Sequence, residues 1–162
     1  MRTTIMLVTL WLCGNCLAQL TEDGRVSARY GTFTLGKRQM LLYNGHPLRP
    51  AVQGNNGLDL GSPFHIGNRD VILATIFGGT ACPYLYQFIT VTKDGASATQ
   101  QFGTCNEAFS VKRNGDAVSL AMHDYRGPFE PEEEKTAARR RTEIFVFHDG
   151  VVSKSTSQKI SK

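Results

Sequence analysis

Residues 70–77 read Asp-Val-Ile-Leu-Ala-Thr-Ile-Phe, and this stretch decides the fold of the 162-residue chain. The run is almost continuously apolar. Successive strand side chains point to opposite sides of a sheet, so apolar residues at both odd and even positions indicate that both faces are covered. The stretch therefore predicts a central strand.

Short runs of strand-forming residues lie on both sides of this stretch, separated by glycine and asparagine. Asn44-Gly45 and Asn114-Gly115 each join two such runs, and Asn-Gly is typical of hairpin turns because both residues must adopt a positive φ. Lys93-Asp94-Gly95 and Asp149-Gly150 also have turn chemistry. The other expected strands cover residues 29–35, 39–43, 46–48, 58–60, 64–66, 84–92, 109–112, 118–123, 143–148 and 151–152.

One segment breaks the strand pattern. Residues 131–141 read Pro-Glu-Glu-Glu-Lys-Thr-Ala-Ala-Arg-Arg-Arg. Proline in the first turn, acids near the start and arginines near the end all suit a helix and its dipole. We therefore expect an all-β domain over residues 19–153, a β-sandwich or partly closed β-barrel of about ten short strands, with one short late helix. Residues 154–162 are polar and basic, and we expect a disordered tail there.

The first eighteen residues have the order of a secretory signal peptide. A positive N-terminus at Arg2 precedes an apolar run over residues 5–12, and small residues precede an expected cut after Ala18. The alternatives are a buried N-terminal element, a membrane anchor and a lipid anchor on Cys13 or Cys16. The run is far shorter than the ~20 residues that span a bilayer, and neither cysteine follows the small residue that lipidation needs. We expect a periplasmic or secreted protein without a lipid anchor or membrane span.

Cleavage after Ala18 changes what the composition implies. It leaves 144 residues, with 17 basic and 14 acidic side chains and a net charge of +3. The positive charge is scattered, so a nucleic-acid partner is not expected. Only Cys82 and Cys105 remain, and in an oxidising compartment one disulfide is the simplest outcome. A metal or redox pair is the alternative, although there is no Cys-x-x-Cys spacing and no nearby histidine. A loop of about 24 residues closed in this way is stabilised by about 3 kcal/mol.

No motif of a known chemistry stands out. The four histidines are far apart, and His-Glu-x-x-His, Gly-x-Ser-x-Gly and phosphate-binding glycine loops are absent from the sequence. His123-Asp124 is interpreted as the end of a strand, and the acidic run at residues 130–134 as a solvated helix start. Arg139, Arg140 and Arg141 are a candidate contact for an acidic partner, although consecutive helical residues point in different directions. We expect no catalytic residues, no metal and no cofactor.

The most distinctive pair of segments is Gly-Gly-Thr-Ala-Cys-Pro at residues 78–83 and Phe-Gly-Thr-Cys at residues 102–105. Paired glycines let two backbones approach each other, and proline stiffens the exit. We interpret this as a stapled bend. The functional alternative is a rigid rim that presents Tyr84, Tyr86 and Asn106 to a ligand, because aromatic residues on rigid loops make good binding anchors.

These two segments, with the Asn44-Gly45 hairpin and the Gly-Asn-Asn-Gly-Leu turn at residues 54–58, resemble a group of small exported bacterial proteins of uncharacterised function. The resemblance covers most of residues 30–150. It implies export and a disulfide, and it supplies no activity and no catalytic residues.

We therefore expect an exported, non-enzymatic binding protein whose partner is another protein of the cell envelope, as an inhibitor or an immunity-type factor. A module that binds an envelope glycan or a small ligand through Tyr84 and Tyr86 is the first alternative. A hydrolase with a dispersed site is the second, and a His–carboxylate cluster in a deep pocket would favour it.

Overall fold

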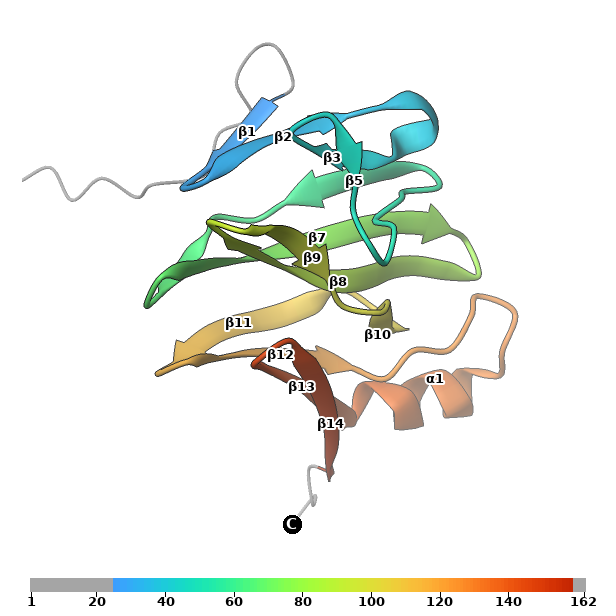
Figure 1. The fold of residues 1–162 in the computed structure, drawn as a ribbon. Coiled ribbons are helices and arrows are strands. Elements are labelled where there is room, and N and C mark those ends of the chain that lie inside the picture. The colour runs from blue at the N-terminus through green and yellow to red at the C-terminus, as the bar shows by residue number, and fades with distance from the viewer. Residues whose placement is uncertain (1–24, 159–162) are drawn as a thin grey trace, which may run out of the picture.

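The computed structural model describes residues 25–158, which form three antiparallel sheets stacked as layers (Figure 1). The upper sheet contains β1 (Arg25–Ala28), β2 (Gly31–Leu35), β3 (Leu41–Tyr43) and β4 (His46–Pro47), with a 3-10 turn at Lys37–Gln39. The middle sheet contains β5 (Gly57–Leu60), β6 (Phe64–Ile66), β7 (Arg69–Gly79), β8 (Cys82–Thr92), β9 (Gly95–Ala98) and β10 (Phe102–Cys105). The lower sheet contains β11 (Ala108–Asn114), β12 (Ala117–His123), β13 (Arg141–His148) and β14 (Val151–Gln158).

The hairpin of β7 and β8 forms the centre of the stack and confirms the expected central strand. Ile72 and Ala74 of β7 belong to the core cluster shared with the upper sheet, whereas Val71 and Leu73 belong to the cluster shared with the lower sheet. The two faces of one strand thus serve two separate cores. This is why residues 70–77 carry no polar alternation, and why the chain forms three layers.

The two cores differ in the side chains that fill them. The upper core buries Phe33, Leu41, Val52 and Ile89 among others. The lower core is dominated by aromatic contacts, in which the ring of Phe88 lies 4.8 Å from that of Phe147, centroid to centroid. Offset aromatic pairs of this kind stabilise a core beyond the area that they bury.

Two consecutive residues at the start of β7 tie the middle sheet to the layers above and below it. Arg69 forms an ion pair of 2.6 Å with Asp149, in the turn between β13 and β14. The fully buried carboxylate of Asp70 accepts from Arg29 of the upper sheet at 3.0 Å and from His65 of β6 at 2.7 Å. The opposite directions of neighbouring strand side chains allow one dipeptide to connect three layers.

The all-β class with one short helix and one disulfide is confirmed, and the sheets stay open, so the barrel alternative does not hold for the described residues. Residues 25–158 contain fourteen strands rather than about ten, because β1, β9 and β10, where no strand was expected, also pair with their neighbours. The helix α1 spans Glu132–Arg139, inside the expected range. It is too short to cross a membrane, and within residues 25–158 no helix could do so.

The expected disordered tail is wrong over residues 154–158. β14 continues to Gln158 and pairs with β13 along its whole length, from His148↔Val151 to Arg141↔Gln158. Pairing with a buried neighbour strand orders a segment whose own composition is polar. The expected signal peptide and the last four residues of the tail lie outside the described residues.

Candidate functional site at the α1 end

The disulfide staples the tip of the central hairpin. Cys82 follows the β7–β8 turn and is bonded to Cys105 at the end of β10, with 4.6 Å between their Cα atoms. The expected close backbone approach occurs at Gly78, where a Cβ atom would overlap the carbonyl oxygen of Cys82. At Gly79 a Cβ atom would meet nothing within 4 Å, so only the first glycine of the pair is required for space.

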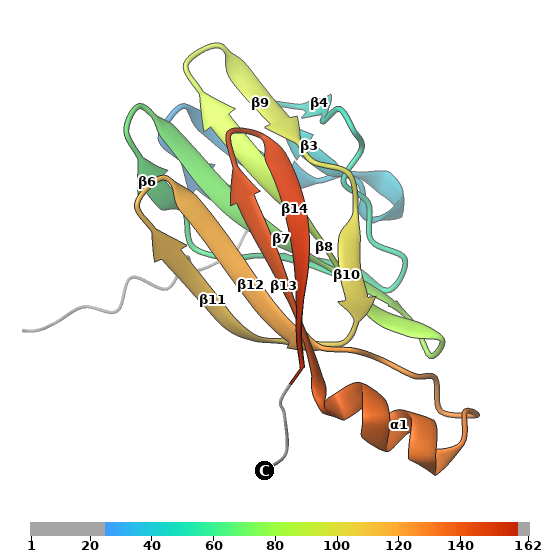
Figure 2. The ribbon, with the colours of Figure 1, turned by 90° about the horizontal axis from the view of Figure 1, so that it is seen from below.

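The loop of residues 124–131, between β12 and α1, extends past this staple (Figure 2). Hydrogen bonds attach it to its neighbours and close its tip. The Tyr125 hydroxyl donates to the Thr80 carbonyl in the β7–β8 turn at 3.0 Å, and Lys135 Nζ of α1 donates to the Pro128 carbonyl at 2.8 Å. The Glu130 N–H donates to the Gly127 carbonyl at 3.2 Å and closes a turn at the tip. The loop is therefore fixed to both the stapled hairpin and the helix.

A cleft of about 380 Å³ lies between this loop and α1, and we call it the α1 cleft. Its lining consists of Asn106, Asp124, Tyr125, Arg126, Pro128, Glu132, Lys135 and Arg139. The charges on its walls are paired with one another. Glu132 lies 3.7 Å from Lys135 and 3.6 Å from Arg139, and Arg126 lies 3.5 Å from Asp124. The cleft is polar, and its lining has three cationic and two anionic side chains.

The structure brings some of the expected binding residues together and separates others. Asn106 and Arg139, which are far apart in sequence, both line the α1 cleft. Arg140 is exposed just beyond the helix, and Arg141 begins β13 and forms an ion pair of 3.4 Å with Asp124. The three arginines lie at the end of α1, just after it and at the start of β13, and their contact with an acidic partner stays a prediction.

The two tyrosines of the candidate rim differ in exposure, and Tyr86 does not lie on the rim. Tyr86 is only 2% exposed, and its hydroxyl accepts from the Ala108 N–H at 2.8 Å. Burial raises the pKa of the Tyr86 phenol, and this hydrogen bond only partly offsets the effect. Tyr84 is half-buried, with its ring 5.8 Å from that of Phe77. The buried Tyr86 ring is therefore not available for a sugar to stack on, whereas Tyr84 packs only partly against the lower core.

Sequence reasoning missed the most exposed aromatic side chain of the described residues. Phe129, at the tip of the loop between Pro128 and Glu130, is 96% exposed. The local sequence Gly-Pro-Phe-Glu-Pro indicates a turn but not which way its side chain points. The two prolines that closely flank Phe129 were the only sequence feature that could have indicated a fixed, exposed side chain, because prolines restrict the backbone around them.

A histidine–carboxylate pair exists elsewhere, away from the α1 cleft. His65 and Asp70 face each other across the β6–β7 hairpin, and the second aspartate oxygen accepts from the Arg29 N–H at 2.9 Å. Neither residue lines the α1 cleft. The arrangement holds layers together through the fully buried carboxylate of Asp70. Within residues 25–158, no group of three or more His, Cys, Asp or Glu side chains is placed to hold a metal ion.

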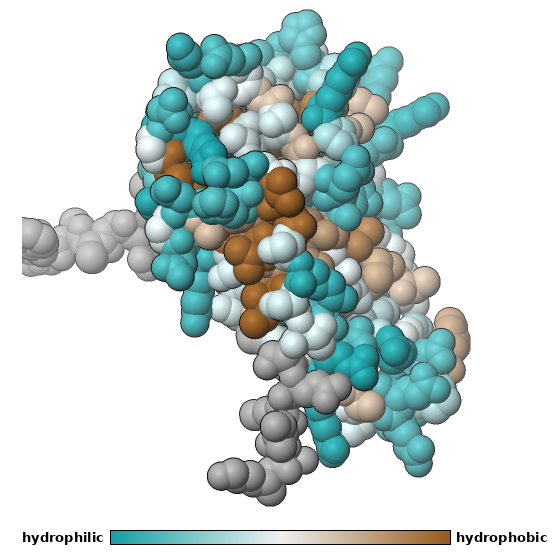
Figure 3. All heavy atoms as spheres, turned by 60° about the horizontal axis from the view of Figure 1, so that its bottom comes forward, coloured by the Kyte–Doolittle hydropathy of each residue, from teal (hydrophilic) through white to brown (hydrophobic). Residues whose placement is uncertain are grey.

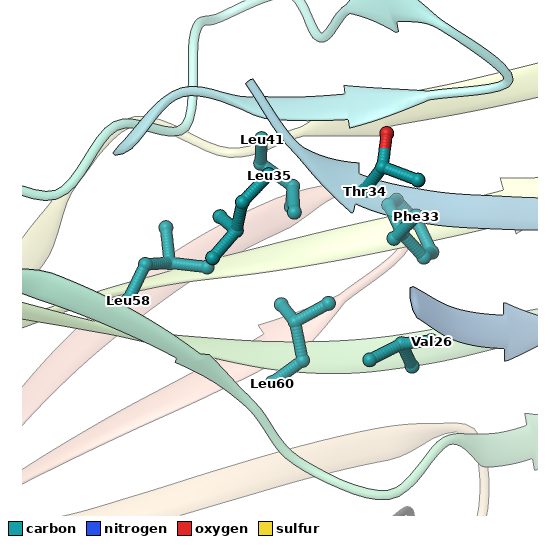
Figure 4. Close-up of a pocket in the computed structure, with 7 residues that line it drawn as sticks. All are labelled: Val26, Phe33, Thr34, Leu35, Leu41, Leu58 and Leu60. Atoms are coloured by element: carbon teal, nitrogen blue, oxygen red, sulfur yellow. The ribbon is translucent and has the colours of Figure 1, made fainter. Parts of the chain in front are cut away.

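An apolar crevice opens between the upper and middle sheets and is shown in Figure 4. Leu35, Leu58 and Leu60 are among its lining residues. Its volume of about 10 Å³ is no larger than one water molecule needs. The crevice is therefore the edge of the upper core and not a ligand site.

No protein-family model, curated protein or solved structure matches this chain. Its function is therefore inferred from the geometry of its own residues.

Proposed function

We propose that this is an exported, non-enzymatic binding protein that engages a protein partner through Phe129 and the rim of the α1 cleft. The observation that carries the proposal is the 96% exposure of Phe129 on a loop that hydrogen bonds attach to the β7–β8 turn and to α1. Burying a phenylalanine ring yields about 1.5–3 kcal/mol. Buried aromatic anchors supply much of the energy in protein interfaces.

The held loop favours binding because its order is already established in the free protein. Association is normally opposed by the entropy that is lost when loops and side chains become fixed. Here the hydrogen bond from Tyr125 to Thr80, in the turn of the stapled hairpin, fixes the start of the loop. The hydrogen bond from Lys135 to Pro128 fixes the loop next to Phe129. Little further entropy is lost when a partner receives the Phe129 ring.

The surroundings of Phe129 favour a protein over a polyanion or a glycan. Beside the loop, Glu132 forms ion pairs with both Lys135 and Arg139. An apolar anchor within a polar, charge-paired rim is the anatomy of a protein interface. The disulfide supports work outside the reducing cytoplasm. Export itself, and inhibition or immunity as the outcome of binding, stay part of the proposal.

The test is site-specific crosslinking with the full chain. A photoreactive benzoyl-phenylalanine replaces Phe129 in one variant and the distant exposed Val111 in a matched control. After illumination in extracytoplasmic extract, we expect one stoichiometric protein adduct from position 129 and none from position 111. Excess wild-type protein should compete for it, while Phe129→Ala should compete about 30-fold less well, as for a hot-spot residue. Adducts that Phe129→Ala displaces as well as wild type does would refute the proposal.

A further inference from the structure

The Cys82–Cys105 disulfide supports two parts of the α1 cleft. Cys82 follows the β7–β8 turn, in which the Thr80 carbonyl accepts from the hydroxyl of Tyr125 at 3.0 Å. Tyr125 lines the cleft, and so does Asn106, which directly follows Cys105 in the chain. One covalent bond therefore underlies two lining segments that are not adjacent in sequence.

The disulfide fixes the end of a strand that has few other contacts. Within residues 25–158, β10 pairs with β8 at two positions, those of Phe102 and Cys105, and the register shifts between them. The Thr104 hydroxyl adds a hydrogen bond of 2.6 Å to the His123 carbonyl of β12. Cys105 itself has a φ of 71°, in the left-handed region that residues other than glycine adopt only at a cost. The end of β10 is thus held in an unfavourable conformation next to the bond that fixes it.

The loop of residues 124–131 depends on polar contacts for its position. None of its eight residues is buried, and five of them are exposed. Figure 3 shows that the end of the molecule that carries α1 is mostly hydrophilic. A segment with little buried apolar area opens easily when its hydrogen bonds are weakened. The order of this loop is therefore sensitive to the stability of the β7–β8 turn, to which Tyr125 attaches it.

The disulfide lies where a reductant can react with it. Both cysteines are half-buried, and neither belongs to one of the two core clusters. Disulfides that are exposed or joined to strained backbone are reduced more easily than buried structural ones. In this reaction a thiolate of a dithiol attacks one sulfur and forms a mixed disulfide, which the second thiol of the reductant resolves. Two electrons and two protons pass to Cys82 and Cys105, and the reductant leaves as its own disulfide.

The position of the disulfide in the fold limits what its reduction changes. Cys82 and Cys105 join β8 and β10, which are neighbours within the middle sheet, so the bond does not tie one layer to another. The contacts between layers, such as the ion pair of Arg69 with Asp149, lie elsewhere. The three sheets can therefore stay assembled when the bond is broken.

We propose that the Cys82–Cys105 disulfide is a redox switch that controls the order of the α1 cleft. When a dithiol reduces the bond, Cys105 leaves its left-handed conformation and the tip of the β7–β8 hairpin separates from β10. The loop of residues 124–131 then loses its fixed support at Thr80, and Phe129 is no longer presented in one place. The effect on a partner rests on the proposed function, whereas the coupling between the disulfide and the loop does not.

Hydrogen exchange of the full chain is compared before and after reduction by dithiothreitol, and alkylation counts the free thiols. In the reduced protein, exchange over residues 105–108 and 124–131 should be about three- to tenfold faster, as for the loss of one hydrogen bond. Residues 146–153, around the β13–β14 turn, should exchange equally in both forms, and circular dichroism should show the same strand content.

Three variants test the route from the disulfide to the loop. In Tyr125→Phe, which lacks the donor to Thr80, the loop should exchange fast in both forms, whereas residues 105–108 should still respond to reduction. The matched control Tyr30→Phe loses a hydrogen bond in another part of the molecule and should respond as wild type does. The double variant Cys82→Ser, Cys105→Ser should resemble reduced wild type with and without dithiothreitol.

Several results would each overturn the proposal. They are a disulfide that dithiothreitol does not reduce in the folded protein, unchanged loop exchange although both thiols are free, a loop response in Tyr125→Phe equal to that of wild type, and unfolding of the whole domain on reduction. Photocrosslinking from position 129 measures the consequence for a partner, and the adduct yield should fall about tenfold on reduction because the loop is no longer pre-ordered. Equal yields from both forms would also overturn the switch. No adduct from either form counts against the proposed function, and the exchange data then decide the switch alone.

Discussion

The hydroxyl of Tyr125 donates a 3.0 Å hydrogen bond to the carbonyl of Thr80, and this contact joins the loop of residues 124–131 to the stapled hairpin. Thr80 lies in the turn between Gly79 and Cys82, so the disulfide and the loop share one support. A loop anchored in this way keeps its tip in one place. In our proposal, the presentation of Phe129 therefore depends on Thr80, which is not among the residues that line the α1 cleft.

Tyr125→Phe should loosen the loop without unfolding the protein. The lost hydrogen bond contributes about 0.5–1.5 kcal/mol. Hydrogen exchange over residues 124–131 should become several times faster, while the melting temperature changes little. The matched control is Tyr30→Phe, which removes a hydroxyl that donates to the Asn68 carbonyl at 2.9 Å in another part of the molecule. Equal exchange in the loop of both variants would show that the Thr80 contact does not hold it.

The two adjacent glycines of the hairpin should respond differently to alanine. A methyl group at position 78 overlaps the Cys82 carbonyl, so Gly78→Ala must push the strands apart and should destabilise the protein by about 1–3 kcal/mol. Gly79→Ala meets open space and should change stability by less than about 0.5 kcal/mol. Urea unfolding of both variants measures the difference. Similar losses would mean that the hairpin tip is not packed as described.

Removal of the disulfide should lower the free energy of unfolding by about 3 kcal/mol, because the open chain regains the entropy of a loop. The double variant Cys82→Ser, Cys105→Ser is compared with wild type in urea, each with and without reductant. Wild type with reductant should unfold as the double variant does, and the double variant should be insensitive to reductant. If reductant does not change the urea midpoint of wild-type unfolding, the disulfide does not have this stabilising role.

The parts of this fold that could be predicted are those set by local pattern. Residues 70–77 predict a doubly covered strand because no polar residue marks an outer face, and Asp149-Gly150 predicts a hairpin because both residues have positive φ there. β14 could not be predicted beyond its first residues. Its serines and Lys154 have no strand pattern, and the order comes from pairing with β13.

The candidate site was harder to predict because it depends on contacts between distant segments. Asn106 and Arg139 meet only after β10 and α1 have taken their places at one end of the stack. Tyr86 was expected at a rim because strand alternation does not reveal which face is covered, and the lower sheet covers it. Apolar residues are usually buried, so a phenylalanine at position 129 would be expected inside the protein and not on its surface.

Asp70 should make the stability of the protein depend on pH in the acid range. Burial alone would raise the pKa of this carboxyl, but hydrogen bonds from His65 and the Arg29 N–H, with both positive charges, bring it below its ordinary value. A carboxylate whose pKa is lowered on folding stabilises the fold above its unfolded pKa of about 3.9, and this contribution is lost as the pH falls through the folded pKa. The contribution of Asp70 to the free energy of unfolding should therefore be complete at pH 7 and decline below about pH 4.

The variant Asp70→Asn isolates this contribution. At pH 7 it should be less stable than wild type by about 2–4 kcal/mol, because Arg29 loses its buried partner. The gap should narrow as the pH falls below about 4, where wild type also becomes protonated. The control is Asp116→Asn, an exposed aspartate of the β11–β12 turn, which should follow wild type at every pH. Urea unfolding at a series of pH values gives both curves. A gap that stays constant down to pH values well below the unfolded pKa would show that Asp70 acts through its shape and not through its charge.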